Sequence, residues 1–471
     1  MAQKCFLVWF GHNNSYFSHR FRELESVARM LGINPSEIYV GDQPSSLSTD
    51  PYAVITLPSD EFANQICKHC VLVRFVLDLW GNGVNDAEVN SCIKENVSDE
   101  MWESHLRGKT FSYKVIGYGI QHTDKSRRDR MNAFGSLFRG FEKVDASAPS
   151  TTLYIIDEHE RNFEQTGTRN ELIQAEKKKT FYGRLIAENE SSERAGYILT
   201  KRPVLGPTSL DNDLAFIMAN MAEIKKGSLV FDPFCGTGGL LITASARGGI
   251  AQIGTDIDMR VLRGEFVAYI KNRVNKDVKT DIFENFKWYR LSVPEILVCD
   301  NSHHCWRTDS PIYDVILTDP PYGVRAGAKK IGAKYAHDIG NRDDYYPQML
   351  GYGAEEVNLD LLQISSQLLV DNGLLVFLLH IELIELFTQD ELELLKESNR
   401  ATKLLVHNTT KKPYVYANEC ARDKQFLDET IVKERVVPKH PDLVTESAVV
   451  QILAAGTGRV LVKMRRRPRT F

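Results

Sequence analysis

The sequence predicts a doubly wound α/β fold for the second half of the chain, preceded by an α+β region. The run 228–239 reads as a buried strand and a glycine-rich turn, and an apolar stretch beginning at Leu240 follows as a helix. Three later apolar runs, at 249–256, 295–300 and 313–319, each end in an aspartate. Parallel strands of an open sheet present their carboxyl ends at one edge. These runs therefore predict one sheet with a functional edge.

The first part of the chain is expected to form a separate α+β region. A strand–helix–strand–helix–strand pattern spans 5–80 and suits a small ferredoxin-like layer. Further strands are expected at 111–119, 151–157 and 181–187. A polar run at 188–196 then predicts the boundary with the α/β part.

The composition is that of an ordinary globular chain rather than a uniformly basic nucleic-acid binder. The 471 residues are 43% hydrophobic and 25% charged, and the formal net charge is −4. That charge does not exclude RNA, because a local basic face is sufficient for binding. The eight cysteines show no framework, which favours a reducing compartment. No apolar run reaches the ~20 residues that span a bilayer, so we expect a cytoplasmic protein without a membrane segment.

The glycine-rich turn predicts a site for a nucleoside-type cofactor. Gly236 and Gly238 allow the backbone to approach a ligand closely. Phe234 is expected to help shape the pocket, and Asp232 ends the preceding strand at the same place. The glycine spacing fits neither the dinucleotide fingerprint nor a phosphate-binding P-loop, so a pyrophosphate ligand is disfavoured.

The next two strands end in carboxylates that suit an adenosine. Asp256 lies twenty residues after Gly236, where a doubly wound fold places the acid that accepts the ribose hydroxyls. Asp300 ends the following strand and is expected to contact the adenine edge. Either residue alone would equally suit a turn that caps a buried strand. Four such strands in order favour a single site instead.

The tetrapeptide Asp319-Pro320-Pro321-Tyr322 predicts chemistry on the exocyclic amine of a nucleobase. The lone pair of such a nitrogen is delocalised into the ring, so the amine is a poor nucleophile until its N–H groups are held in hydrogen bonds that favour tetrahedral geometry. The Asp319 carboxylate and the Pro320 carbonyl can accept these hydrogen bonds, and Pro321 stiffens the corner because each proline ring fixes φ at about −65°. Tyr322 offers an aromatic face to a base taken out of its stack.

These motifs resemble the class I S-adenosylmethionine-dependent methyltransferases, in the subgroup that acts on exocyclic amines. The resemblance implies a Rossmann-like fold and S-adenosylmethionine as the cofactor. The segment 206–220 resembles the cofactor-contacting motif that lies ahead of the glycine turn in this group. Thr208 and Ser209 would reach the cofactor, and they are also expected to cap the helix that follows.

More narrowly, the chain is similar to the catalytic subunits of the eukaryotic tRNA (guanine-10-N2)-methyltransferases. The match is carried by 206–220, 230–258 and 314–325, with weaker echoes at 79–83 and 181–187. The resemblance implies a ferredoxin-like region over 1–70, a THUMP RNA-binding region over 71–190 and a methyltransferase domain over 196–471. It also implies tRNA as substrate and a small zinc-binding activator subunit as partner. Residues 409–456 match nothing in this family and are expected to be divergent or inserted.

Other functions remain open on the sequence. Asp319 is equally compatible with methylation of adenine N6, of guanine N2 in ribosomal RNA, or of a glutamine amide in a protein. A catalytically inactive RNA-binding scaffold is a further alternative. The intact glycine turn and tetrapeptide disfavour it, and an RNA-binding N-terminal region disfavours a protein substrate.

Two basic segments are candidates for contact with RNA. The segment 107–143 holds nine basic residues, punctuated by three phenylalanines whose rings could equally face a core. The second set follows Tyr322 and comprises Arg325, Lys329, Lys330 and Lys334. The basic run 463–469 is expected to be a solvated tail, and 382–397 an amphipathic helix. Cysteines with metal-like spacing occur at 67–70 and 299–305. No metal site is expected at 67–70 because no second pair lies at a suitable distance, nor at 299–305 because Asp300 already has a cofactor role there.

Overall fold

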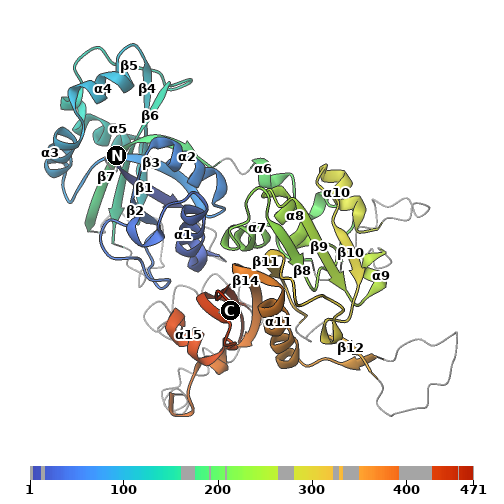
Figure 1. Cartoon of the computed structure of the whole chain (residues 1–471). Helices are drawn as coiled ribbons and strands as arrows, with labels where there is room; N and C mark the ends of the chain where they lie inside the picture. The colour runs from blue at the N-terminus through green and yellow to red at the C-terminus, as the bar shows by residue number, and fades with distance from the viewer. Residues whose placement is uncertain are drawn as a thin grey trace, which may run out of the picture.

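Two seven-stranded sheets organise the chain, one in each half (Figure 1). This computed structural model describes residues 4–11, 16–160, 176–189, 192–206, 209–263, 281–321, 328–332, 349–391, 427–453 and 456–469. Within that part, no helix is long and apolar enough to cross a membrane.

The N-terminal sheet has the strand order β2-β1-β3-β7-β6-β4-β5. Its strands are β1 (Lys4–Phe10), β2 (Tyr52–Leu57), β3 (Val73–Gly83), β4 (Thr110–Tyr118), β5 (Lys143–Val144), β6 (Thr151–His159) and β7 (Lys177–Glu188). The helices between them are α1 (Arg20–Met30), α2 (Asp60–His69), α3 (Asp86–Asn96), α4 (Asp99–Leu106) and α5 (Asp124–Ala133). The predicted strands of this region are confirmed. One sheet carries both the expected ferredoxin-like and THUMP-like regions, and their division at residue 70 stays a prediction.

Strand β1 is buried on both faces, and its alternation explains how. Phe6 and Val8 lie in the same apolar cluster as α1 and α2, whereas Leu7 and Trp9 belong to a second cluster with Phe75. Successive side chains of a strand point to opposite faces, so one continuous apolar run supplies both cores. The sheet is therefore a central layer with apolar packing on each side.

The C-terminal sheet has the strand order β10-β9-β8-β11-β14-β16-β15. Its strands are β8 (Leu229–Asp232), β9 (Ala251–Asp256), β10 (Glu295–Val298), β11 (Tyr313–Thr318), β14 (Leu369–Glu382), β15 (Leu443–Ile452) and β16 (Thr457–Arg466). The first five in this order pair in parallel, and β16 is antiparallel to both of its neighbours. This arrangement confirms the predicted doubly wound α/β fold.

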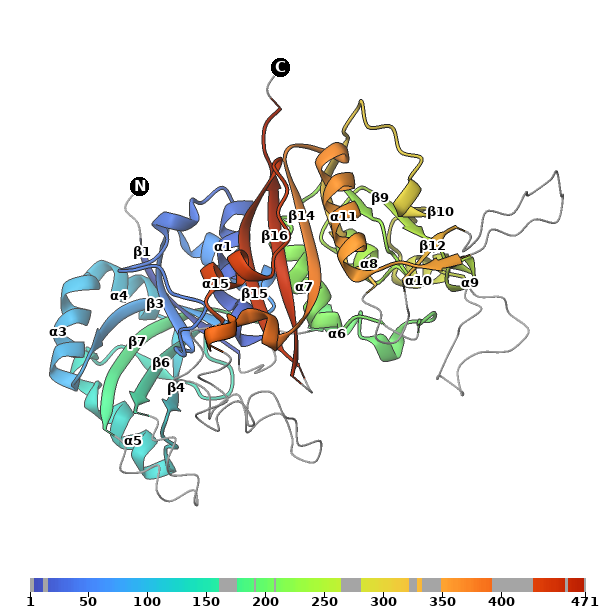
Figure 2. The same ribbon diagram turned by 90° about the horizontal axis from the view of Figure 1, so that it is seen from below.

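Short helices and a small hairpin complete the C-terminal part (Figure 2). The helices are α6 (Ser192–Ala195), α7 (Asn212–Met221), α8 (Gly239–Ala246), α9 (Met259–Leu262), α10 (Phe283–Tyr289), α11 (Ala354–Leu368) and α15 (Glu429–Arg435). The hairpin joins β12 (Lys329–Ile331) to β13 (Met349–Gly351). Within the segment 409–456, the described residues supply α15 and the edge strand β15.

The two halves share one core. A single apolar cluster includes Leu24 of α1, Ile217 of α7 and Leu461 of β16. Buried polar groups join the halves as well. The Glu23 carboxylate, 0% exposed, accepts hydrogen bonds from the Val71 amide at 2.7 Å and from the Asn220 side chain at 2.7 Å. The packing therefore fixes the N-terminal sheet against the C-terminal one.

The basic run at the end of the chain is structured, so the expectation of a solvated tail is wrong. Lys463 lies in β16, is 2% exposed, and contacts the Glu223 carboxylate at 2.6 Å. Arg469 pairs with the Asp371 carboxylate at 2.6 Å. Lys463 and Arg469 each have an acid partner from another segment, and these pairs hold the run against the sheet.

The helix expected at 382–397 begins later than predicted: within the described part, residues 389–391 are α-helical, but residues 382–388 are not. Strand β14 continues to Glu382, which pairs with Thr457 of β16. A short 3-10 helix, Leu383–Leu386, follows, and Phe387 is extended. The sheet ladder takes the beginning of this segment because β16 offers it a partner strand. The residues from 392 onward lie outside the described part.

The phenylalanines of the basic segment 107–143 pack inward. Phe134 is 0% exposed and belongs to one apolar cluster with Trp80 and Trp102, and Phe138 and Phe141 pack against it. The core-facing interpretation of these rings is therefore confirmed. An RNA contact by the basic side chains of the segment stays a prediction.

Candidate functional site

The aspartates singled out by the sequence gather at the carboxyl edge of the C-terminal sheet. Strands β10, β9, β8 and β11 run in parallel, so their carboxyl ends point the same way. The strand order reverses between β8 and β11, which is where an open α/β sheet forms a ligand crevice. Asp232 ends β8, Asp256 ends β9, Asp300 follows β10 and Asp319 follows β11. The fold brings all four to this edge.

The turn between β8 and α8 takes a backbone conformation that requires glycine. Gly236 has φ of +51° and Gly238 has φ of +79°, both in the left-handed region. A Cβ at Gly238 would lie 3.1 Å from the Phe286 ring. The Gly236 amide donates to the Asp256 carboxylate at 3.0 Å, and this bond fastens the turn to β9. Tight backbone and a neighbouring acid are the features that a nucleoside-type ligand needs.

Asp256 lies directly beneath the turn. One of its oxygens accepts from Gly236, and the other accepts from the Asp258 amide at 2.8 Å. Burial raises the pKa of Asp256, and these amides oppose the effect. Each carboxylate oxygen has a second lone pair. The residue is therefore held in a fixed orientation and keeps capacity for hydroxyl donors.

Asp232 links the two strands on either side of the reversal. It is 1% exposed and accepts from the Thr318 hydroxyl at 2.6 Å and from the Phe234 amide at 3.1 Å. Burial raises its pKa to about 7, and the charges of Asp256 and Asp319 act in the same direction. The role of Thr318 in this linkage was not predicted from the sequence.

Asp319 has an acceptor without a partner. Its Oδ1 atom is buried and accepts no hydrogen bond from the residues that the structure describes. Burial raises the pKa of Asp319 to about 6, and the charge of Arg459 acts against the rise. Pro320 is buried and Pro321 is half-buried. Buried polar atoms are ordinarily paired, so this oxygen is available to a donor that enters the edge.

Asp300 is more fully engaged than the sequence suggested. Its Oδ1 accepts from the Ser302 amide at 2.9 Å, and its Oδ2 accepts from the Ile331 amide at 2.6 Å. Asp300 thus caps the turn 301–303 and holds strand β12 against the edge. These bonds fix its position, and its expected contact with adenine stays a prediction.

The cap of α7 differs from the expectation. The helix begins after Asp211, whose carboxylate accepts from the Leu214 amide at 3.2 Å and from the Tyr16 hydroxyl at 2.9 Å. Ser209 instead donates its hydroxyl to the Gly206 carbonyl at 3.1 Å. The prediction of a Thr208-Ser209 cap is wrong because the helix starts later. Thr208 lies outside the described residues, as does Tyr322.

Asn285 was missed by the sequence analysis. It is 0% exposed, accepts from the Val204 amide at 2.9 Å, and donates to the Val204 and Thr237 carbonyls at 3.0 and 3.2 Å. Its side chain ties the strand-free segment before α7 to the glycine turn. No local pattern marks such a residue, because its partners are distant in the chain.

The second basic set is described only in part. Lys329 and Lys330 form β12, and Lys330 pairs with the Glu356 carboxylate at 3.1 Å. Arg325 and Lys334 lie outside the described residues. A role of this loop in holding RNA stays a prediction.

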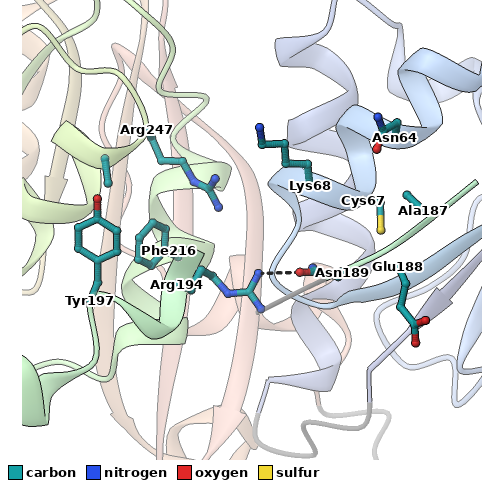
Figure 3. A pocket seen from close by; sticks show the side chains of 11 residues that line it. Asn64, Cys67, Lys68, Ala187, Glu188, Asn189, Arg194, Tyr197, Phe216 and Arg247 are labelled. Atoms are coloured by element: carbon teal, nitrogen blue, oxygen red, sulfur yellow. Dashed lines mark hydrogen bonds between the residues drawn. The ribbon is translucent and has the colours of Figure 1, made fainter. Parts of the chain in front are cut away.

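A cavity of about 450 Å³ lies at the junction of the two halves (Figure 3). Cys67 and Lys68 of α2 line one side, and Phe216 of α7 and Arg247 line the other. Arg247 donates to the His69 carbonyl at 2.7 Å and follows the last residue of α8. The glycine turn precedes the first residue of the same helix. The cavity is therefore at the far end of α8 from the aspartates and does not belong to the carboxyl edge.

Two known domain families match successive parts of this chain. The domain family described as "Tmrp11 THUMP N-terminal domain" matches residues 4–191, and "RMKL-like, methyltransferase domain" matches residues 200–342. A relative from Dictyostelium discoideum is 30% identical over 383 residues, which cover 77% of this chain and 72% of that protein. One from Bos taurus is 30% identical over 371 residues, covering 77% and 76%. Both carry the name tRNA (guanine(10)-N(2))-methyltransferase TRMT11.

Among solved structures, the chain is similar to TrmN from Thermus thermophilus. The sequence identity is 14%, the TM-score is 0.39, and the alignment covers 98% of this chain and 99% of that one.

Proposed function

Because this chain belongs to the family of the tRNA (guanine(10)-N(2))-methyltransferases, we propose that it transfers a methyl group from S-adenosylmethionine to the N2 amine of guanosine 10 in tRNA. The observation that carries the proposal is the buried oxygen of Asp319, which has no hydrogen-bond partner among the described residues. A planar amine needs an acceptor at this point before its lone pair can attack.

The residues of the tetrapeptide act on the target amine. Asp319 and the Pro320 carbonyl accept hydrogen bonds from its two N–H groups, and Pro321 keeps the corner rigid. Tyr322 stacks on the guanine after it leaves its helix. Most of the rate enhancement comes from this orientation, since aligned groups can lower a barrier by about 7–11 kcal/mol.

The residues of the edge hold the cofactor, which supplies a methyl group on a positively charged sulfur. Asp256 accepts the ribose hydroxyls, and Asp300 contacts the adenine. The glycine turn forms the rest of the pocket through Phe234, Gly236 and Gly238, and Asp232 ends the strand before it. Thr208 and Ser209, in the segment ahead of the turn, are also proposed to contact the cofactor. The positive φ angles of the two glycines and the fixed carboxylate of Asp256 support this fit.

In this proposal the two parts of the chain have separate roles. We propose that the ferredoxin-like region 1–70 and the THUMP-like region 71–190 bind the tRNA, and that 196–471 forms the catalytic domain. The cytoplasm is the proposed location, and the cysteines of the described part support it because all of them are free thiols.

The outer edge of β10 is the proposed docking site of a small zinc-binding activator subunit. Among the described residues, β10 pairs only with β9. Leu297 and Val298 are 39% and 56% exposed, and Trp288 of the nearby α10 is 64% exposed. An open strand edge with apolar side chains is suited to a partner and is a liability without one.

Substitution at this edge tests the partner. Val298→Glu should abolish co-purification of the activator subunit, because burying the new carboxylate at the interface is unfavourable. Ile384→Glu is the matched control, since Ile384 is 40% exposed and lies in another part of the molecule. If the activator subunit co-purifies equally with the wild-type chain, Val298→Glu and Ile384→Glu, β10 is excluded as the docking edge.

The reaction itself is tested on an unmodified tRNA transcript. The transcript is incubated with S-adenosylmethionine and the chain co-expressed with the activator, then digested and analysed by mass spectrometry. N2-methylguanosine in the fragment that contains position 10 is the expected product. If the chain binds the cofactor but leaves tRNA unmethylated, the substrate is another amine, such as adenine N6, a guanine of ribosomal RNA or a glutamine amide. Absence of both activities would leave an RNA-binding scaffold.

A further inference from the structure

Arg202 is a buried arginine beside the glycine turn, and none of the roles assigned above involves it. Arg202 is 2% exposed, and its Nε and Nη1 atoms are buried without a hydrogen-bond partner in the described part of the chain. A buried charged group lowers stability unless an opposite charge or hydrogen-bonding groups compensate it. The position therefore calls for an anion that the described part of the chain does not supply.

The guanidinium lies against the first residue of α8. A Cβ placed on Gly239 would be 3.3 Å from Nη1 of Arg202. The backbone around Arg202 is held in this place by Asn285, which bonds both Val204 and Thr237 of the turn. Arg202 is thus fixed to the same turn that carries Gly236 and Gly238.

The surroundings of Arg202 favour a negative group. The amino end of a helix presents unpaired amides and a partial positive charge, so it repels a cation and attracts an anion. Burial lowers the pKa of Arg202, and in the described part only the Tyr289 hydroxyl opposes that effect. The Arg202 guanidinium lies beside this amino end, so the two together favour an anion there.

We propose that Arg202 and the first amides of α8 bind the carboxylate at the amino-acid end of S-adenosylmethionine. The inference rests on the proposed function, because that cofactor brings a carboxylate close to the glycine turn. A planar guanidinium suits a carboxylate because two of its N–H groups can bind the two oxygens. Arg202 would then anchor the end of the cofactor that Asp256 and Asp300 do not reach.

Two ligands isolate the interaction. S-adenosylmethionine and its decarboxylated analogue differ only at the proposed contact, and isothermal titration calorimetry gives the dissociation constant of each. The wild-type chain should bind the carboxylate-bearing ligand about tenfold to a hundredfold more tightly, the range expected for a charge-assisted pair. Arg202→Met should remove that preference while leaving affinity for the decarboxylated ligand within about threefold of wild type.

Two further variants serve as controls. Arg202→Lys should keep part of the preference, because an ammonium retains the charge but not the planar fork. Tyr289→Phe should keep all of it, since the hydroxyl contacts the arginine and not the ligand. Should Arg202→Met fail to fold, Arg202→Lys decides the matter, and an undiminished preference in that variant overturns the proposal.

The outcomes separate this inference from the proposed function. A preference that persists in Arg202→Met, or equal losses for both ligands, would show that Arg202 has a structural role only. A wild-type chain that binds neither ligand would instead contradict the methyltransferase function itself.

Discussion

Asp157 in the N-terminal sheet is buried, and Asp319 at the edge of the C-terminal sheet is half-buried with one buried carboxylate oxygen, but the surroundings of the two acids differ. Asp157 is 1% exposed and contacts Arg130 at 2.7 Å and the Thr180 hydroxyl at 2.6 Å. Burial alone would raise the pKa of Asp157, but hydrogen bonds from His122 and Thr180 hold it well below the usual range. Asp319 has an oxygen without a partner among the described residues, and burial raises the pKa of Asp319 to about 6.

The difference separates a structural acid from a functional one. Asp157 has donors on every side, so its charge joins α5, β6 and β7 and leaves nothing for a ligand. In the described part of the chain Asp319 Oδ1 has no such donor, and the charge of Asp319 is unfavourable until a ligand supplies one. Perturbed acids in a crevice mark functional sites for this reason. Substituting the two residues should therefore have opposite consequences.

The largest effect is expected from Asp319→Ala. Loss of an acceptor that orients the reacting group should lower kcat by about a hundredfold to a thousandfold. Affinity for S-adenosylmethionine should stay within about threefold of wild type, because Asp319 contacts the amine and not the cofactor. Methylation kinetics and calorimetry measure the two quantities, and Asp309→Ala, at an exposed acid, is the control. A collapse of cofactor binding would contradict the assigned role.

Asp157→Asn should affect stability and not chemistry. Arg130 keeps its contact with the Asp86 carboxylate at 2.6 Å but loses its two hydrogen bonds to Asp157, so the free energy of unfolding should fall by about 1–3 kcal/mol. Urea denaturation at pH 7 measures the loss. Cofactor affinity of the folded variant should match wild type, and a loss confined to affinity would place Asp157 in the wrong category.

Asp319→Asn should increase stability at pH 8 by about 1–3 kcal/mol. The folded pKa of Asp319 is about 6, above its unfolded value near 4. Its contribution to stability is therefore full below pH ~4 and is lost as the pH rises through about 6. The gain from Asp319→Asn should accordingly vanish near pH 4.

The pKa of Asp157 is lowered, so its contribution has the opposite sign. It is present above the unfolded pKa and is lost as the pH falls. Urea denaturation between pH 4 and pH 8 gives the change in free energy of unfolding of each Asn variant relative to wild type. Plotted against pH, the changes for Asp319→Asn and Asp157→Asn should have opposite slopes. Parallel curves would remove the distinction between the two acids.

The smallest effect is expected at the contact between the halves. Tyr16→Phe removes the hydrogen bond to Asp211 and should lower the free energy of unfolding by about 1 kcal/mol. Thermal denaturation detects the change, and methylation kinetics should be unaffected. A measurable change in kcat would mean that this contact positions the site as well.

Much of the edge could be predicted because its signals are local. Each of the four parallel strands is an apolar run that ends in an acid or leads into one. The strand order then brings Asp232, Asp256, Asp300 and Asp319 together at one edge. The glycine turn was equally predictable, since positive φ at Gly236 and Gly238 leaves little choice of residue.

What the sequence did not predict depends on contacts between distant segments. Asn285 and Arg202 acquire their roles from a turn that lies more than thirty residues away in each case. The cap at Asp211 was misplaced because Thr208 and Ser209 are also good capping residues. The final basic run was expected to be a solvated tail because its acid partners, Glu223 and Asp371, are distant from it in the sequence.

The central claim is that Asp319 prepares the N2 amine of a guanosine for methylation, and a substrate without that amine tests it most directly. Two tRNA transcripts are compared, one with guanosine at position 10 and one with inosine, which lacks only the exocyclic amine. We expect methyl incorporation from S-adenosylmethionine into the first and none into the second. Equal incorporation into both would contradict the claim.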